Sequence, residues 1–310
     1  MRTEESGDIR PRQDLPYIRI PPIHHPRHNS YTIHSWYISS FSYYTSQKGA
    51  KMDKNLLKKE LEGHNLSSSV YCFEEIDSTN TFAKTLARDG ASELTIVTAD
   101  RQTAGRGRLG RSFYSPEGTG IYLSIIVRPD FCFEDAFLIT PSVAVGISKL
   151  LDKYSINSQI KWVNDIYVNS KKVCGILTES SFNTNGKTDW AVIGIGINLI
   201  KPKNGFPDEI SNIADAPFKS EADFGSREKL TAEIISSVIS VYKDLPSTEF
   251  VKAYRERSYL TGKDVILPNG ETVKVMGIDD RCGLTVKHAN GITETITSSD
   301  VSVKLSGSSI

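Results

Sequence analysis

The sequence predicts an α+β protein in which a mixed β-sheet flanked by helices is followed by a small β-barrel. Between Val70 and Arg257, apolar strand-like runs alternate with helical segments. Beyond Leu260, short alternating strands are separated by turns at Pro268-Asn269-Gly270 and Asn290-Gly291, which is typical of a small barrel. A chain of 310 residues is long enough for one large domain or two unequal ones.

The composition argues against several classes of protein. Lys plus Arg and Asp plus Glu both number 37, so no global field attracts nucleic acid or a membrane surface. No apolar run approaches the ~20 residues of a membrane span. The four cysteines are far apart and form no CxxC pair, which argues against a zinc site or a disulfide framework and fits a reducing cytoplasm.

Residues 1–51 differ in composition from the remainder of the chain. They are rich in Pro, His, Tyr and Ser, and no acidic residue occurs between Asp14 and Asp53. An organelle-targeting leader is one alternative, weakened by the acidic residues near the start. A metal-binding tract at His24-His25-x-x-His28 is another, but it lacks companion ligands. We expect a disordered extension, with the globular part beginning at Met52.

The elements of the globular part can be placed in chain order. The expected strands of the sheet are 70–73, 94–99, 121–127, 160–168, 172–179 and 192–199. The expected helices are 56–61, 81–88, 133–154, 227–243 and 249–257. The expected barrel strands are 265–267, 272–275, 284–286, 292–296 and 301–303. The turn at 169–171 makes a hairpin of its two flanking strands, and the domains are expected at 52–258 and 259–310.

The segment Arg101–Arg111, with the sequence RQTAGRGRLGR, follows the strand expected at 94–99. Glycine lets the backbone approach a ligand closely, and arginine presents a planar fork of donors that matches phosphate or carboxylate oxygens. No histidine occurs between Asn65 and Lys287. A reaction housed there must therefore use Arg, Lys, Asp and backbone amides rather than a histidine base. A solvated basic turn or an RNA-binding patch is the alternative for the loop alone.

Three further polar groups accompany this loop. Asp77–Asn80 precedes a helix, where such residues serve as N-caps and can also bind a polar ligand. Lys161, Asn164, Asp165 and Lys172 interrupt apolar strands, where uncompensated charge is costly. The strand 192–199 contains two glycines, which indicates that another backbone or a ligand passes close by.

Five motifs in this order resemble those of biotin protein ligases. They are DSTN at 77–80, QxxGRGRxGR at 102–111, KWxND at 161–165, KxxGIL at 172–177 and GxGIN at 194–198. The resemblance extends from about residue 70 to residue 304, and the combination is far more specific than a lone Gly-rich match. Val163 stands where the family usually has Pro, and Cys174 where it often has Gly or Ala. Neither residue supplies a reacting atom.

The resemblance implies a class II synthetase-like catalytic domain with a C-terminal SH3-like barrel. It implies that biotin and Mg-ATP form biotinyl-5′-adenylate and pyrophosphate, after which a lysine of a biotin carboxyl carrier protein or domain attacks the mixed anhydride. Adenylation brings a carboxylate to a phosphate, so it needs charge neutralisation and alignment more than a proton shuttle. A histidine-free site rich in Arg and Lys suits that chemistry. We expect a cytoplasmic enzyme that does not act at a membrane, and a homodimer is compatible with the sequence.

Roles for individual residues follow from the resemblance alone. It implies biotin binding by Ser78, Thr79, Asn80, Gln102, Arg106, Gly107, Arg108, Ser124, Lys172, Gly175, Gly194 and Gly196. It implies ATP or adenylate binding by Arg106, Arg108, Arg111, Phe113, Lys161, Asn164, Lys172 and Asn198. The implied catalytic residues are Lys172, Arg108 and Asp165. Asp165 is a candidate either for metal binding or for the incoming lysine, and Lys304 stands where relatives often carry an Arg that reaches the nucleotide.

Two other functions were weighed against this one. A lipoyl-type acyl-adenylate transferase shares the adenylating architecture, but the GRGR loop favours biotin. A biotin-responsive repressor needs an N-terminal winged helix-turn-helix. Only about eighteen residues separate Met52 from the first expected strand, too few for three helices. We therefore expect no sequence-specific DNA binding.

Overall fold

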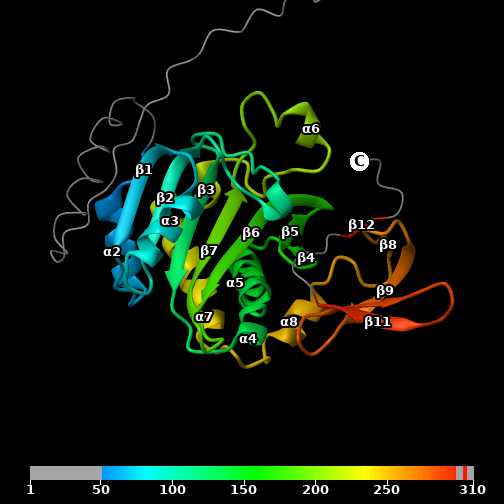
Figure 1. The fold of residues 1–310 in the computed structure, drawn as a ribbon. Helices are drawn as coiled ribbons and strands as arrows, with labels where there is room; N and C mark the ends of the chain where they lie inside the picture. The colour runs from blue at the N-terminus through cyan, green and yellow to red at the C-terminus, as the bar shows by residue number, and fades with distance from the viewer. Residues whose placement is uncertain (1–50, 298–302, 306–310) are drawn as a thin grey trace, which may run out of the picture. The chain divides into compact units, whose positions relative to one another are not determined.

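A seven-stranded mixed sheet organises the larger part of the protein (Figure 1). The computed structural model describes residues 51–297 and 303–305, so the extension expected before Met52 lies almost entirely outside the described residues. The strand order is β1-β2-β3-β7-β6-β5-β4, with β1 and β2 parallel and the other neighbours antiparallel. The strands are β1 (Val70–Ile76), β2 (Ile96–Gln102), β3 (Gly120–Val127), β4 (Gln159–Lys161), β5 (Asp165–Val168), β6 (Lys171–Phe182) and β7 (Thr188–Asn198).

Helices cover both faces of this sheet. Successive residues of a strand point to opposite faces. Ile125 and Ile193 belong to a large core shared with α2 (Lys54–Gly63), α5 (Ile139–Lys153) and α7 (Arg227–Tyr242). Their neighbours Ile126 and Val192 pack instead with α3 (Thr79–Arg88) in a smaller core. The shorter helices are α4 (Phe133–Ala136), α6 (Asp208–Ser211) and α8 (Val251–Glu256).

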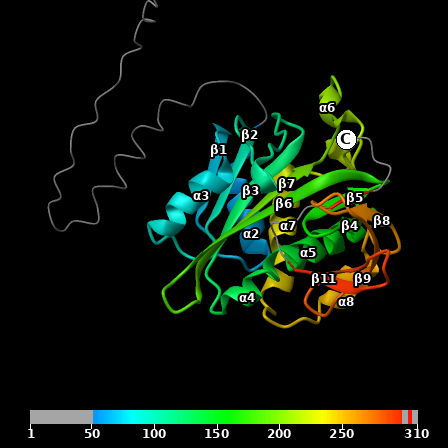
Figure 2. The ribbon, with the colours of Figure 1, turned by 45° about the vertical axis from the view of Figure 1, so that its right-hand side comes forward.

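The C-terminal part forms a second, five-stranded antiparallel sheet in the order β11-β10-β9-β8-β12 (Figure 2). Its strands are β8 (Asp264–Ile266), β9 (Thr272–Ile278), β10 (Leu284–Lys287), β11 (Thr293–Ile296) and β12 (Lys304–Leu305). The larger core continues into this sheet through Val265, Val275 and Leu284. The predicted α+β class, with a mixed sheet followed by a second small sheet, is confirmed. The strand predicted at 301–303 lies mostly outside the described residues.

Two elements that were predicted as continuous are each divided into two in the structure. The helix expected over 133–154 is divided into α4 and α5. Pro141 has no amide hydrogen and is tolerated only in the first turn of a helix, so α5 begins at Ile139. The strand expected over 160–168 is two antiparallel strands, β4 and β5, in which Lys161 pairs with Asp165 across a turn. Long-range hydrogen bonds to the turn override the strand preference of its residues.

Three of the longer helices, α2, α3 and α7, begin at a side-chain cap, whereas α5 has none. The Asp53 carboxylate accepts hydrogen bonds from the amides of Asn55 and Leu56 at the start of α2, and Ser226 caps α7 through the Lys229 amide. Ser78 caps α3, whose first residue is Thr79. These caps satisfy amides that have no partner inside the helix. Among the described helices, none has the length and apolar composition needed to cross a membrane.

Candidate binding and catalytic site

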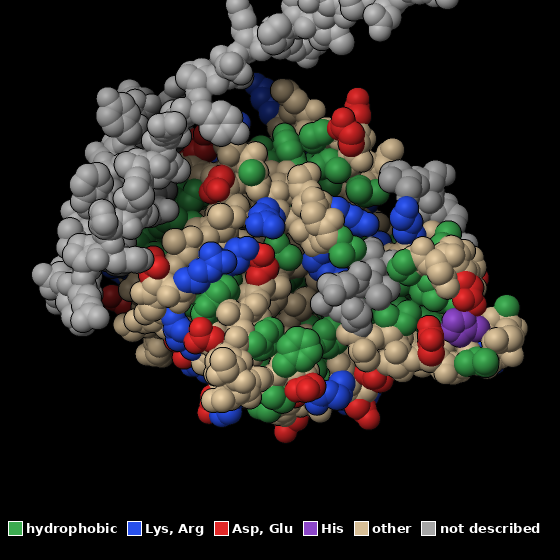
Figure 3. Space-filling model, in the orientation of Figure 1, with side chains coloured by type: hydrophobic (Ala, Val, Ile, Leu, Met, Phe, Trp, Pro, Cys, Tyr) green, Lys and Arg blue, Asp and Glu red, His purple; other side chains and the backbone are tan. Residues whose placement is uncertain are grey.

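A cavity of about 770 Å³ is bounded by the loop after β2, by the turn between β4 and β5, and by the faces of β6 and β7. Ile210–Ala214 and Val303–Leu305 contribute further lining. In the view of Figure 3, Lys and Arg side chains lie across the middle of this face of the protein. The residues predicted from the sequence that line the cavity are Ser78, Thr79, Asn80, Gln102, Arg106, Gly107, Arg108, Arg111, Phe113, Lys161, Asn164, Asp165, Lys172, Gly175, Gly194, Gly196, Asn198 and Lys304.

One side of the cavity is a neutral wall, formed by Ser78, Thr79, Asn80 and Gln102. The first three are at most 4% exposed and lie at the start of α3. The Gln102 side-chain oxygen accepts hydrogen bonds from the Thr79 amide at 2.9 Å and from its hydroxyl at 3.1 Å. Because each polar group already has a partner, the wall keeps its shape without a ligand.

Ser124 does not line the cavity but supports the wall from below. It is fully buried on β3, and its hydroxyl lies 2.6 Å from Asn80 Oδ1 and 2.9 Å from Thr79 Oγ1. Asn80 Nδ2 donates to the Leu177 carbonyl and to Glu179 Oε2, both at 3.1 Å. The Asn80 amide therefore has a single orientation consistent with this network.

Glu179 is a supporting residue that the sequence analysis missed. Its other carboxylate oxygen pairs with Lys84 Nζ at 2.6 Å. Burial raises the pKa of Glu179, but hydrogen bonds from Lys84 and Asn80 outweigh it, so the pKa lies below its ordinary value. Asn80 and Lys84 are four residues apart on one helix face, and that spacing was the available signal for a shared partner.

Two glycines of β7 let side chains lie directly on the sheet. A Cβ atom on Gly194 would fall 2.1 Å from Asn80 Oδ1, and one on Gly196 would fall 2.6 Å from Phe113 Cε1. Real Cβ contacts are never that short, so both positions require glycine. The close approach predicted at this strand is therefore made by the side chains of Asn80 and Phe113.

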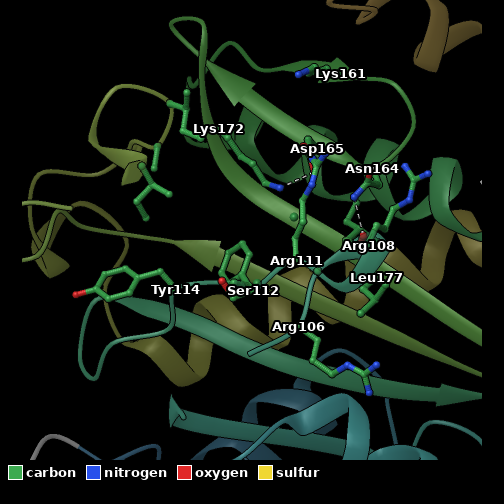
Figure 4. Close-up of a pocket in the computed structure, with 18 of the residues that line it drawn as sticks. Arg106, Arg108, Arg111, Ser112, Tyr114, Lys161, Asn164, Asp165, Lys172 and Leu177 are labelled. Carbon is green, nitrogen blue, oxygen red and sulfur yellow. Dashed lines mark hydrogen bonds and ion pairs between the residues drawn. The ribbon is translucent and has the colours of Figure 1, made fainter. Parts of the chain in front are cut away.

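The opposite side is a cationic region, formed by Arg108, Arg111, Lys161 and Lys172, and Arg106 lies on the same loop but points away from this region. The loop that carries the arginines returns on itself, because the Gly107 amide donates to the Arg111 carbonyl at 2.7 Å and the Phe113 amide to the Gly105 carbonyl at 2.9 Å. Arg108 Nη1 donates to Asn164 Oδ1 at 2.9 Å. In Figure 4, Arg106 extends away from Asp165.

Lys172 and Asp165 form an ion pair of 2.7 Å on adjacent strands (Figure 4). The Lys172 ammonium also lies 5.9 Å from the centre of the Phe113 ring. Among the described residues that line the cavity, Asp165 is the one carboxylate facing several cations. The region therefore has an excess of positive charge suited to an anion.

Lys161 is a largely buried lysine at the edge of this region. Burial lowers the pKa of Lys161, and the positive charges of Lys172 and Arg111 act in the same direction, while Asp165 opposes them. Its ammonium lies 3.4 Å from the Tyr167 hydroxyl. A negative ligand beside Lys161 would favour its charged form.

The segment 210–215, which lies after β7 and contains the end of α6, completes the rim near Lys172. The Lys172 amide donates to the Ile213 carbonyl at 2.7 Å, and the Asp215 amide donates to the Lys172 carbonyl at 2.9 Å. Asn198 Nδ2 donates to the Asp215 carbonyl at 3.1 Å. The sequence analysis did not identify this segment, because its own residues form no recognisable motif.

Comparison with known proteins places this arrangement in a family. A family model described as "Biotin/lipoate A/B protein ligase family" matches residues 72–198. The chain is 32% identical over 263 residues to the bifunctional ligase/repressor BirA of Bacillus subtilis, covering 82% of this chain and 80% of that protein. It is 26% identical to a biotin--[acetyl-CoA-carboxylase] ligase of Mycobacterium tuberculosis, over 72% of this chain and 85% of that protein.

Solved structures give the same result. The biotin protein ligase of Aquifex aeolicus in complex with biotin and ATP superposes with a TM-score of 0.63, with 28% sequence identity, covering 77% of this chain and 99% of that one. The chain belongs to the biotin/lipoate A/B protein ligase family. Within it, the chain groups with the biotin protein ligases, as the motifs predicted.

Proposed function

We propose that this chain is an ATP-dependent biotin protein ligase. It forms biotinyl-5′-adenylate and then transfers biotin to one lysine of a biotin carboxyl carrier domain. The observation that carries the proposal is the juxtaposition, in one cavity, of the neutral wall and the cationic region. A ligand with an uncharged hydrogen-bonding ring at one end and an anhydride of carboxylate and phosphate at the other matches both.

The neutral wall would hold the ring system of biotin. Ser78, Thr79, Asn80 and Gln102 offer fixed donors and acceptors, and Ser124 fixes two of them from below. Because these side chains are already held in place, they do not have to be reoriented when a ligand replaces water. Asn80 and Phe113, which lie directly on β7 at Gly194 and Gly196, would form the floor.

The cationic region would carry out adenylation. A biotin carboxylate oxygen attacks the α-phosphorus of ATP, a carbon–oxygen–phosphorus link forms, and pyrophosphate leaves with the electron pair. Repulsion between the carboxylate and the phosphate is the main barrier to this reaction. Lys172 and Arg108 would lower it by neutralising both anions. Arg106, Arg111 and Lys161 would bind the remaining phosphates, while Asn164, Asn198 and Phe113 would hold the nucleoside.

Magnesium fits the donors of this cavity. Mg²⁺ is usually held by one or two carboxylates together with substrate phosphates, rather than by an all-protein cage. Asp165 supplies one carboxylate in the region where the phosphates would lie. The bound ion would add charge neutralisation there.

In the second half-reaction, the amine of the carrier lysine attacks the acyl carbon. An amide bond forms, the bond from that carbon to the phosphate oxygen breaks, AMP leaves, and the amine nitrogen loses a proton. Asp165 is the carboxylate of the described lining that could accept the proton or orient the amine. Metal binding and lysine orientation therefore stay as its two candidate roles.

One experiment separates the proposal from its main alternative. The protein is incubated with Mg-ATP and either biotin or lipoate, and the products are identified by mass spectrometry. We expect biotinyl-adenylate and pyrophosphate in the first reaction and no lipoyl-adenylate in the second. A lipoyl-adenylate formed in preference would reassign the substrate. Addition of a carrier domain should then yield a biotinylated lysine.

The remaining elements of the proposal concern context. We infer a cytoplasmic enzyme acting on the carrier of a biotin-dependent carboxylase, without specific DNA binding, as a monomer or a homodimer. A DNA-binding measurement at low salt would contradict this if a specific site emerged above non-specific binding. Size-exclusion chromatography with light scattering would decide the oligomeric state.

We also propose that 1–51 is dispensable, that 52–258 is the catalytic domain and that 259–310 is a barrel domain. Met52 is 5% exposed, and its amide donates to Asp100 Oδ2 at 3.1 Å. A chain beginning at Lys51 should therefore keep full activity and thermal stability. A chain beginning at Asn55 lacks the Asp53 cap and should be less stable by about 1 kcal/mol or more. Equal melting temperatures for the two would contradict the boundary.

A further inference from the structure

The turn 162–165, here called the anchored turn, joins β4 to β5 and carries three residues of the cavity lining, Trp162, Asn164 and Asp165. Asn164 is held on the cavity side by Arg108, and its own amide donates to the Ile176 carbonyl at 2.9 Å. Asp165 pairs with Lys172. Trp162 and Val163 are 5% and 2% exposed. Half of the turn is therefore buried in the protein, while the other half faces the proposed nucleotide.

The buried half of the anchored turn is fastened by two hydrogen bonds from distant parts of the chain. The Trp162 indole nitrogen donates to the Cys282 carbonyl at 2.8 Å, between β9 and β10 of the C-terminal sheet. The Tyr254 hydroxyl, on α8, donates to the Val163 carbonyl at 3.2 Å. Tyr254 is fully buried, and burial raises its pKa well above the ordinary value, so the hydroxyl keeps its proton.

The acceptor on the C-terminal sheet is itself rigidly placed. Asp279 Oδ1 accepts hydrogen bonds from the amides of Arg281 at 2.8 Å and Gly283 at 2.6 Å. The Asp279 amide donates to the Gly283 carbonyl at 2.9 Å. These bonds close the 279–283 turn around Cys282. The Cys282 carbonyl is therefore aimed by the turn rather than by its own side chain.

Helix α8 is tied to the same 279–283 turn and to the edge of the large sheet. Arg255 Nε donates to the Ile278 carbonyl at 2.7 Å, just before the turn, and Arg255 Nη2 donates to Asp280 Oδ1 at 2.5 Å within it. After the helix, the Ile160 amide donates to the Arg257 carbonyl at 2.7 Å, and the Tyr259 amide donates to the Ile160 carbonyl at 2.9 Å. The anchored turn, α8 and the C-terminal sheet thus form one hydrogen-bonded junction.

We propose that Tyr254 and Trp162 are positioning residues for adenylation. Through this junction they fix the backbone of the anchored turn, and thereby set where Asn164 and Asp165 face the cavity. The inference rests on the proposed function and adds to it a structural role for α8 and the C-terminal sheet. Tyr254 is the cleaner probe, since it does not line the cavity and its hydroxyl donates to the Val163 carbonyl.

The junction is independent of the neutral wall. Asn80, Thr79 and Gln102 are held by Ser124, Leu177 and Glu179, and none of these bonds involves the anchored turn. A displaced turn should therefore impair the use of ATP while biotin binding stays intact. A general loss of stability would weaken both equally, so the two explanations give different measurements.

The test compares Tyr254→Phe with Tyr154→Phe. The Tyr154 hydroxyl donates to Glu233 on α7 at 2.5 Å, and neither residue lines the cavity. Tyr154→Phe therefore also removes one tyrosine hydrogen bond, but outside the site. We expect Tyr254→Phe to lower kcat/KM for ATP in adenylate formation about tenfold and to leave the Kd of biotin within about twofold. Tyr154→Phe should change neither quantity, even where urea unfolding shows a similar loss of stability.

Two further variants make the test independent of the folding of Tyr254→Phe. Trp162→Phe removes the donor to Cys282 and should show the same ATP-selective loss, with Trp190→Phe on β7 as its control. Cys282→Ala keeps the carbonyl acceptor and should leave kcat/KM for ATP unchanged. Wild-type kcat/KM in folded Tyr254→Phe and Trp162→Phe would overturn the inference, as would equal losses in biotin and ATP parameters.

Failure of the proposed function is distinguishable from failure of this inference. If the wild-type protein forms no biotinyl-adenylate, the proposed function is wrong. The positioning role is then decided by calorimetric titration with Mg-ATP alone. Weaker ATP binding in Tyr254→Phe than in Tyr154→Phe would support it, and equal binding would overturn it.

Discussion

The two sides of the cavity satisfy their polar groups in different ways. In the neutral wall, the buried Thr79 and Asn80 both bond to Ser124 beneath them, and Thr79 also bonds to the half-buried Gln102. In the cationic region, Arg111 is exposed, and Asp165 is the one carboxylate of the described lining that faces the lysines and arginines. The wall is complete without a ligand, whereas the cationic region gains its charge balance from one.

This difference assigns separate tasks to the two sides. A preformed wall supplies affinity and shape selection in the ground state. Exposed cations on a glycine-containing loop contribute most when negative charge gathers between them, as it does during adenylation. Substitutions in the cationic region should therefore change rates, and substitutions in the wall should change biotin affinity.

Lys172→Ala should give the largest effect, and it should separate the rate of adenylation most clearly from the affinity for biotin. Removing an electrostatic donor from the transition state costs roughly 2.7–4 kcal/mol, so single-turnover adenylate formation should slow by about 10²- to 10³-fold. Biotin affinity should change far less. Lys187→Ala is the matched control, because Lys187 forms an ion pair of 2.6 Å with Asp130 away from the cavity lining. Unchanged adenylation in Lys172→Ala would give that lysine a structural role only.

Arg108→Gly should affect retention of the intermediate more than its synthesis. Charge-assisted hydrogen bonds of about 1.5–3 kcal/mol each form when the loop closes on the adenylate, so its release should accelerate roughly tenfold or more. The variant should continue to consume ATP slowly and should label bystander lysines. Release can be followed by filtration and mass spectrometry. A variant that holds the adenylate as tightly as wild type would show that this loop is not a lid.

Gly194→Ala tests the wall from the opposite direction. The added methyl group would displace Asn80, whose Oδ1 atom lies 2.1 Å from the new Cβ position. Overpacking of this kind costs about 1–3 kcal/mol, so the Kd of biotin in calorimetry should rise about tenfold. ATP affinity should stay near the wild-type value. Gly63→Ala, at a glycine with open space around it, is the control and should alter neither.

Glu179→Gln should give the smallest effect, because it alters only the charge behind the wall. The folded-state pKa of Glu179 is depressed below its ordinary value of 4.5. Its contribution to stability is therefore present above pH 4.5 and is lost as the pH falls through the folded-state pKa. The variant should be less stable by about 1 kcal/mol near neutral pH. The check is urea unfolding of both proteins at several pH values. A difference in unfolding free energy between wild type and variant that stays the same at acidic pH would contradict the assigned ion pair.

Local patterns in the sequence were sufficient to find most of the polar residues that line the cavity. The GRGR loop, the KWxND segment and the paired glycines each combine unusual residue types within a few positions, and all of them line one cavity. The supporting residues were out of reach of local patterns. Asn80 meets Glu179 across 99 positions, and Trp162 meets Cys282 across 120. Such partners are set by the topology of the sheets.

The same limit explains the predicted strand that was wrong. Residues 160–168 have the composition of one strand, and strand preference depends strongly on tertiary context. The reversal at Trp162–Asn164 is fixed by acceptors and donors on α8 and the C-terminal sheet, which lie more than ninety residues away along the chain. Pro141, in contrast, was visible in the sequence, and its effect on the helix start follows from covalent geometry.

The glycine face of β7 has a consequence for how this family's sequences can vary. Gly194 and Gly196 point toward Asn80 and Phe113, while Ile193 and Ile197 point into the core. One set of positions cannot grow and the interleaved set cannot shrink, so the permitted substitutions alternate along a single strand. We therefore expect small and large residues to alternate along this strand in related sequences. The residue sizes allowed on β7 are therefore set by two side chains, Asn80 and Phe113, that come from other segments of the chain.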